Sequence, residues 1–242
     1  MSATKTIGIL GGMGPMASVE FYRRLVQRTD ARTDQGHVHI LIDNDPSVPD
    51  RTAALLKEGT WEDPVPALQA MACRLEAAGA EILAMPCNTA HAYIAQIRAA
   101  VSIPMIDMIE ETASAIDRSP VGLLATKGTT RARLYQDAVE ARGIETIVPG
   151  AEDQDTVMAV IRAIKTNEDP EEQLRRIAPV VDRLAAAGAV AAIAACTELS
   201  LLTEHARREG TKIPWIDALD VLVRATLRAA GARRVGEREE SE

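Results

Sequence analysis

Residues 74–89 read RLEAAGAEILAMPCNT, and residues 183–198 read RLAAAGAVAAIAACTE. Each stretch begins with a helical pattern that stops at glycine, continues as an apolar run of strand length, and ends at a cysteine. In both, the cysteine follows the arginine by 13 residues. Apolar strands between helices are typical of a parallel sheet covered on both faces. The repeated stretch therefore predicts an α/β chain with two similar halves.

Two further pairs of segments indicate an internal duplication. The apolar residues 7–10 precede a glycine loop, as residues 121–124 do, and IPMID at 103–107 resembles IPWID at 213–217. The three pairs occur in the same order, at offsets of 114, 109 and 110 residues. We therefore expect two similar lobes, each a mostly parallel sheet flanked by helices.

The other expected elements alternate along the chain. Strands are predicted at residues 6–10, 37–42, 81–85, 103–107, 121–124 and 213–217. Helices are predicted at residues 16–29, near 52, at 66–78, at 88–99 and from 155 to beyond 165. In parallel sheets, ligands bind beyond the carboxyl ends of the strands. The two lobes should therefore enclose one cleft.

Cys87 and Cys196 follow equivalent strands, which predicts one thiol on each wall of that cleft. A lone buried cysteine is usually an apolar packing residue. Two equivalent thiols, however, can remove a proton from one face of a carbon and return it to the other. Helix N-termini after each cysteine are expected to favour the thiolate. Cys73, inside an apolar helical stretch, is interpreted as a core residue.

Composition narrows the function. The 242-residue chain has a net charge of −8, which argues against a nucleic-acid surface. We find no apolar run of the roughly 18 residues that a membrane span requires, and no signal peptide, so a cytoplasmic protein is expected. Three cysteines in that compartment are expected to be thiols. Neither a metal-ligand spacing nor a Schiff-base lysine is evident, and we predict no metal and no cofactor.

Several residues allow two interpretations. Asn88, Thr89 and Thr197 fit helix N-caps but could also bind a carboxylate. Arg51, at the start of a helix, is either solvated or a bidentate carboxylate partner. His91, four residues after Cys87, either lowers a thiol pKa or is a structural histidine. Residues 11–15 (GGMGP) form a tight turn and only a weak dinucleotide fingerprint.

Four motifs occur together in this chain: GGMGP at 11–15, DRT at 50–52, PCNTAH at 86–91 and CTEL at 196–199. On these motifs the chain resembles the aspartate/glutamate racemase family over nearly its whole length. Glu198 and Arg51 resemble the aspartate branch, since glutamate racemases typically carry histidine after the second Cys-Thr. Ala195 departs from the pattern, in which glycine often precedes the second cysteine.

The resemblance implies two lobes related by a pseudo-twofold axis that exchange their last elements. The first lobe would comprise residues 1–101 and 213–242, and the second residues 102–212. It also implies a cofactor-independent enzyme, a homodimer, and Arg51 and Lys165 as ligands of the side-chain carboxylate. By the same analogy, Cys196 would face the Cα proton of the L enantiomer and Cys87 that of the D enantiomer.

The predicted function is therefore interconversion of L- and D-aspartate by two cysteines. The expected catalytic residues are Cys87 and Cys196. The expected substrate-binding residues are Met13, Arg51, Asn88, Thr89, Thr126, Thr129, Lys165 and Thr197. A broad-specificity or glutamate racemase remains the alternative within the same superfamily. A non-catalytic two-lobed binding protein is the alternative from another class, but it would not need paired cysteines.

Overall fold

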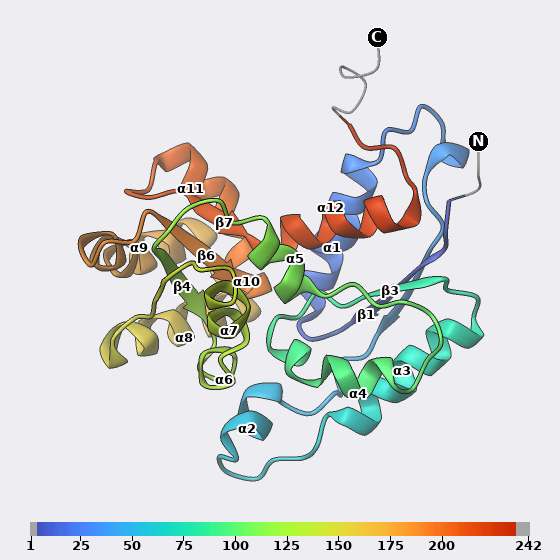
Figure 1. Ribbon diagram of the computed structural model, residues 1–242, viewed down its shortest axis with the longest axis horizontal. Coiled ribbons are helices and arrows are strands. Elements are labelled where there is room, and N and C mark those ends of the chain that lie inside the picture. The colour runs from blue at the N-terminus through green and yellow to red at the C-terminus, as the bar shows by residue number, and fades with distance from the viewer. Residues whose placement is uncertain (1–3, 236–242) are drawn as a thin grey trace.

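The computed structural model describes residues 4–235, which form two parallel sheets flanked by helices (Figure 1). The first sheet has the order β2-β1-β3, with β1 at Ile7–Gly11, β2 at Ile40–Asn44 and β3 at Ile82–Ala84. The second has the order β5-β4-β6-β7, with β4 at Val121–Ala125, β5 at Thr146–Ile147, β6 at Ala191–Ala195 and β7 at Trp215–Asp217. The pairings between these strands are parallel. The α/β fold class with two similar lobes is confirmed.

Helices cover both sheets. In the first half of the chain they are α1 at Pro15–Arg28, α2 at Arg51–Leu56, α3 at Val65–Ala77, α4 at Ile94–Arg98 and α5 at Met108–Ser114, with 3-10 turns η1 at Asp34–Gly36 and η2 at Thr89–Tyr93. In the second half they are α6 at Lys127–Arg131, α7 at Leu134–Glu140, α8 at Ala151–Lys165, α9 at Pro170–Ala186, α10 at Thr197–Ser200, α11 at Thr203–Glu209 and α12 at Ala218–Ala230.

The central strands β1 and β4 are fully buried, and a glycine in each allows a helix to approach closely. A Cβ at Gly8 would lie 3.3 Å from Leu75 Cβ of α3, and 2.8 Å from both Ala80 Cβ and Leu83 Cδ2. A Cβ at Gly122 would lie 3.0 Å from Leu184 Cδ1. Interiors are packed too densely to absorb such contacts freely. The duplicated strands therefore use glycine for the same packing reason.

One apolar cluster joins the two lobes. It combines residues of β1 and β4 with residues of α1, α5, α7 and α12, and includes Ile7, Phe21, Leu123, Tyr135 and Leu222. Separate clusters lie on the outer faces, between the first sheet and α3 and between the second sheet and α8 and α9. Because the central cluster draws on both sheets, the lobes are held together by shared burial of apolar surface.

The helices α5 and α12 exchange lobes. Each begins after an aspartate, Asp107 or Asp217, whose carboxylate accepts hydrogen bonds from two N–H groups of the first turn. α5 packs against α7 of the second half and against α12, while α12 packs against α1 of the first half (Figure 1). Equivalent segments therefore cross in opposite directions between the lobes.

The strands before these helices do not cross. β7 is hydrogen-bonded to β6, so residues 215–217 belong to the second sheet, although residues from 213 onward were expected in the first lobe. The helix α12 packs on α1 of the first lobe, and Lys5 N–H donates to Ala230 O at 2.9 Å at the end of that helix. The strand hydrogen bonds thus stay within each lobe, and the exchange of α5 and α12 begins at their capping residues. The lobe division as a whole stays a prediction.

Some predicted elements differ in extent. The strand expected at 103–107 is only an isolated bridge between Leu83 and Met105, although the equivalent segment 213–217 forms β7. The strand expected at 37–42 begins at Ile40, because residues 34–36 form η1. The helix expected at 88–99 is divided into η2 and α4 at Tyr93, whose φ of −110° and ψ of 11° are not helical. The helix expected from residue 155 begins at Ala151.

The interpretation of Cys73 as a core residue was wrong. Its side chain is exposed, and Sγ donates to Ala100 O at 3.4 Å. On α3 the buried face is formed by Leu68, Met71, Ala72 and Leu75, and Cys73 falls outside it. Within residues 4–235, the helices are too short or too polar to cross a membrane.

The duplicated glycines give a matched pair of stability predictions. Gly8→Ala should lower the free energy of unfolding by about 1–3 kcal/mol, because two side-chain atoms lie inside contact distance of the added methyl. Gly122→Ala should cost less, since its nearest atom is the end of a flexible leucine side chain. Denaturant unfolding of both variants and the wild type measures the two costs. A larger loss in Gly122→Ala than in Gly8→Ala would contradict this packing argument.

Candidate active site

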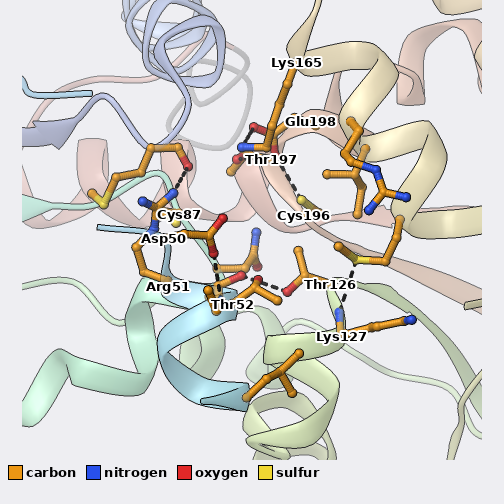
Figure 2. A pocket seen from close by; sticks show the side chains of 18 of the residues that line it. Asp50, Arg51, Thr52, Cys87, Thr126, Lys127, Lys165, Cys196, Thr197 and Glu198 are labelled. Carbon is orange, nitrogen blue, oxygen red and sulfur yellow. Dashed lines mark hydrogen bonds and ion pairs between the residues drawn. The ribbon is translucent and has the colours of Figure 1, made fainter. Parts of the chain in front are cut away.

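A cleft of about 380 Å³ lies at the carboxyl ends of the parallel strands (Figure 2). Its walls come from the loops after β1, β2, β3, β4 and β6 and from α8. The lining residues predicted from sequence are Met13, Arg51, Cys87, Asn88, Thr89, Thr126, Lys165, Cys196 and Thr197. Segments far apart in the chain are thus brought to one site, as expected for this sheet edge.

The two cysteines lie on different sides of the cleft. Cys87 follows β3 on the side of Asp50 and Arg51, and Cys196 follows β6 on the side of Lys165 (Figure 2). Each cysteine is only 5% exposed, so the two thiols are equally buried. Both are free. The arrangement offers one thiol to each face of a molecule held between them.

A carboxylate contacts one of the thiols. Cys196 Sγ donates to Glu198 Oε2 at 3.0 Å, and Glu198 Oε1 pairs with Lys165 Nζ at 2.8 Å. Burial and then the Glu198 charge raise the pKa of Cys196 well above its ordinary value. Burial alone would lower the pKa of the Lys165 ammonium, but the Glu198 carboxylate beside it raises that pKa overall. The expectation of a stabilised thiolate was therefore wrong for Cys196, because burial and the carboxylate outweigh the helix terminus.

Three threonine hydroxyls form a triangle between the lobes. Thr89 Oγ1 lies 2.9 Å from Thr126 Oγ1 and 3.0 Å from Thr129 Oγ1, and the latter two are 3.0 Å apart. Thr126 also caps α6 by accepting from Thr129 N–H. Thr129 is fully buried and does not line the cleft, in contrast to its predicted contact with substrate. It holds the other two hydroxyls in place from behind.

Asn88 presents an unused donor. The Tyr135 hydroxyl donates to Asn88 Oδ1 at 2.5 Å, which fixes the orientation of the amide. Asn88 Nδ2 is buried and has no hydrogen-bond partner among the described residues. A buried donor without a partner is costly, and a ligand in the cleft would satisfy it.

Arg51 is oriented by backbone carbonyls. It opens α2, where Asp50 accepts from Ala53 N–H as the helix cap. Its Nη1 donates to Val48 O and Pro49 O at 2.9 Å each, and Nη2 lies 3.5 Å from Met13 O. Nε is buried and has no partner among the described residues. The guanidinium is thus held at the cleft with donor capacity to spare.

His91 is structural. Its Nδ1 donates to Cys87 O at 2.8 Å, because Nε2 accepts from Met108 N–H at 3.1 Å and so carries no proton. Burial lowers its pKa. The neutral ring joins the Cys87 backbone to the first turn of α5, and both of its nitrogens are occupied. This resolves the two interpretations that the sequence left open, since His91 contacts the Cys87 carbonyl and not the thiol.

Several residues that line the cleft were not predicted from the sequence. The additional residues are Asp50, Thr52, Ala53, Leu56, Glu58, Lys127, Asp155, Met158, Ile161, Arg162 and Glu198. The duplication carried a signal for Glu198, which stands two residues after its cysteine, as Thr89 does. The α8 residues gave no signal, because helix periodicity does not tell which face meets another lobe. In the 11–15 loop, Gly12 serves packing, because a Cβ there would collide with the Asp45 backbone.

Comparisons with known proteins show which family and which fold this chain shares. The Asp/Glu/hydantoin racemase family model matches residues 10–226. An aspartate racemase of Picrophilus torridus is similar in structure with a TM-score of 0.84 and 34% identity, covering 96% of this chain and 97% of that one. A broad specificity amino-acid racemase of Bacillus subtilis is 28% identical over 229 residues, 91% of this chain and 96% of the relative. An aspartate racemase homologue of Pyrococcus horikoshii, 24% identical with a TM-score of 0.73 over 94% of this chain and 99% of that one, shares the fold.

Among residues 4–235, no cluster of His, Cys, Asp and Glu could hold a metal ion.

The buried His91 predicts a pH dependence of stability. Its pKa is lowered in the folded state, so the unfolded state binds the extra proton as the pH falls below about 6.5. Folding stability should therefore fall below that pH, by up to about 1.4 kcal/mol per pH unit for this group. Denaturant unfolding at several pH values should show that His91→Gln lacks this component. The control His39→Gln, at an exposed position, should keep it. An unchanged slope in His91→Gln would contradict the assignment.

Proposed function

Because the chain belongs to the Asp/Glu/hydantoin racemase family, we propose that it interconverts L- and D-aspartate by proton transfer between Cys87, Cys196 and Cα. Family membership makes the chain an amino-acid racemase. The observation that carries the finer proposal is the pair of equally buried thiols on different sides of one cleft. The 34% identical relative from Picrophilus torridus, an aspartate racemase, supports the choice of substrate.

The reaction needs one thiolate and one thiol. The thiolate removes the Cα proton and becomes a thiol, while the opposite thiol protonates the other face of Cα and becomes a thiolate. The proton count is unchanged, and the configuration at Cα is inverted. The assignment of each enantiomer to one of the two cysteines rests only on the family resemblance.

The developing negative charge lies on the α-carboxylate, which takes on enolate character when the proton leaves. Hydrogen-bond donors in a cleft that excludes water stabilise such charge most effectively. The unpartnered Asn88 amide is the best-placed donor, and the hydroxyls of Thr89, Thr126 and Thr197 line the same cleft. Thr129 would act only by positioning Thr89 and Thr126.

The distal carboxylate would be held by Arg51. Its buried Nε has no partner among the described residues, and a guanidinium binds a carboxylate through parallel hydrogen bonds. Lys165 is already paired with Glu198, so a substrate carboxylate would have to share this ammonium. Arg51 is therefore the stronger candidate of the two cations.

A broad-specificity racemase is the second candidate. The Bacillus subtilis relative has that activity by its name and covers nearly the whole chain. Because Glu198 partly neutralises Lys165, the cleft has less need of a second carboxylate on the substrate. A panel of D- and L-amino acids, followed by chiral chromatography, separates the two candidates. Aspartate should be racemised with the highest kcat/KM if the first holds.

The proposal includes a homodimer, a cytoplasmic location and independence of any cofactor or metal. The homodimer rests only on the family resemblance. The three free thiols support a reducing compartment. Retention of activity after dialysis against EDTA and after pyridoxal-phosphate trapping reagents would support independence of metal and cofactor.

Replacing either thiol should abolish racemisation. Cys87→Ser and Cys196→Ser should each lower kcat by at least about a thousandfold, because a serine hydroxyl is a far weaker acid and base at Cα. Chiral chromatography measures the loss, and Cys73→Ser, at an exposed thiol, is the matched control with full activity. In D₂O, the first turnovers should place deuterium in the product enantiomer and leave recovered substrate protonated. Equal early labelling of both would contradict a separate thiol for each face.

Removing Arg51 should weaken aspartate turnover selectively. A charge-assisted hydrogen bond contributes about 1.5–3 kcal/mol, so Arg51→Ala should lower kcat/KM on aspartate by at least about tenfold. Arg162→Ala, which removes an exposed cation that also lines the cleft, is the matched control and should cost less. A larger loss in Arg162→Ala would place the distal carboxylate at Arg162 instead.

A further inference from the structure

The two halves of the active site differ two residues after each cysteine. The duplication matches Cys87 with Cys196, and the residues two positions later are Thr89 and Glu198. The Thr89 hydroxyl is engaged with two other threonines, whereas the Glu198 carboxylate accepts a hydrogen bond from Cys196 Sγ at 3.0 Å. Two equally buried thiols therefore have unequal partners.

The Glu198 carboxylate is held from several sides. Oε1 pairs with Lys165 Nζ at 2.8 Å, and Oε2 faces Cys196 Sγ. A Cβ at Gly14 would lie 3.1 Å from Oε1, so the loop before α1 closes over the carboxylate. Its side chain is 5% exposed. Glu198 is thus fixed beside the sulfur and is not free to turn toward solvent.

The charged and titratable groups near Cys196 come from several elements. Glu198 lies on α10, Lys165 on α8 and Tyr135 on α7, and Cys87 follows β3 on the other side of the cleft. Tyr135 is buried, and burial raises its pKa, so it is neutral. Glu198 favours the protonated sulfur and Lys165 the thiolate. Since Lys165 is paired with Glu198 and the sulfur contacts Glu198 directly, the carboxylate prevails.

We propose that Glu198 is a positioning residue that keeps the proton on Cys196, so that the free enzyme holds Cys196 as the thiol. The inference rests on the proposed two-thiol function. A carboxylate accepts a hydrogen bond from S–H but repels S⁻, whereas the Thr89 hydroxyl has no charge. Like charges across a small cleft also disfavour two thiolates together.

This assignment gives the reaction a preferred starting direction. Because Cys196 is protonated, turnover of the free enzyme must begin with Cys87 as the base, on the enantiomer whose Cα–H faces Cys87. After that turnover Cys87 carries the proton taken from Cα, and Cys196 has given its own proton to the product. Restoring the starting form requires one proton to leave Cys87 and one to reach Cys196 through solvent, unless the opposite enantiomer binds and reverses the transfer.

Alkylation of the unmodified protein tests the assignment without any variant. Iodoacetamide reacts with thiolates. Cys87 and Cys196 are both 5% exposed, so the exposed fraction favours neither residue. At neutral pH, peptide mass spectrometry should show Cys196 reacting at least about tenfold more slowly than Cys87. Equal rates, or faster reaction of Cys196, would overturn the assignment.

A variant then tests the role of Glu198. In Glu198→Gln, alkylation of Cys196 should accelerate by at least about tenfold, and the preference for Cys87 should shrink. With Cys73 and Cys87 both replaced by serine, the ultraviolet thiolate absorbance of Cys196 should titrate about one pH unit lower or more in the Gln variant. Glu58→Gln, the same change at another carboxylate of the cleft, should leave both rates unchanged. An unchanged Cys196 rate in folded Glu198→Gln would overturn the role of Glu198.

These measurements separate the inference from the proposed function. If aspartate is not racemised but Cys87 still alkylates first, the proposed substrate fails and the assignment of the proton stands. If aspartate is racemised but Cys196 alkylates as fast as Cys87, the function stands and the inference fails.

Discussion

The packing of α5 against α12 is the contact on which the active site depends. Each helix starts at a capping aspartate, Asp107 or Asp217, and each leaves its own half of the chain to cover the other. The central apolar cluster between the two sheets includes residues of both helices. Because interiors are close-packed and deform little, this cluster sets how the two sheet edges face each other. The cleft with its two thiols lies at those edges.

A buried ion pair reinforces the same junction. Arg24 on α1 is 6% exposed and contacts Asp217 Oδ2 at 2.6 Å, Glu20 Oε1 at 2.6 Å and Ser200 O at 2.9 Å. Asp217 thus caps α12 and binds α1 of the other lobe. Such a group costs free energy to desolvate, so it adds orientation more than stability. It ties α12 and the backbone after Cys196 to the first lobe.

Duplication supplies two nearly equal halves, and the chemistry depends on where they differ. Thr89 and Glu198 occupy equivalent positions but contact different groups, one a pair of hydroxyls and the other a thiol and an ammonium. In one turnover, one sulfur must act as the base and the other as the acid. A difference in their surroundings decides which sulfur keeps its proton. The carboxylate of Glu198 provides that difference within hydrogen-bonding distance of one sulfur.

Local periodicity and spacing were enough to predict the α/β class, the duplication and the positions of Cys87 and Cys196 at strand ends. The exchange of α5 and α12, the Thr89–Thr126–Thr129 triangle and the pairing of Glu198 with Cys196 and Lys165 depend on long-range packing. Each joins segments whose approach depends on how helices and sheets pack. Local patterns carry no information on that orientation, which is also why the exposed face of Cys73 and the α8 lining residues other than Lys165 could not be predicted. His91 shows the same limit, since its role followed only when Met108 N–H was seen to donate to it.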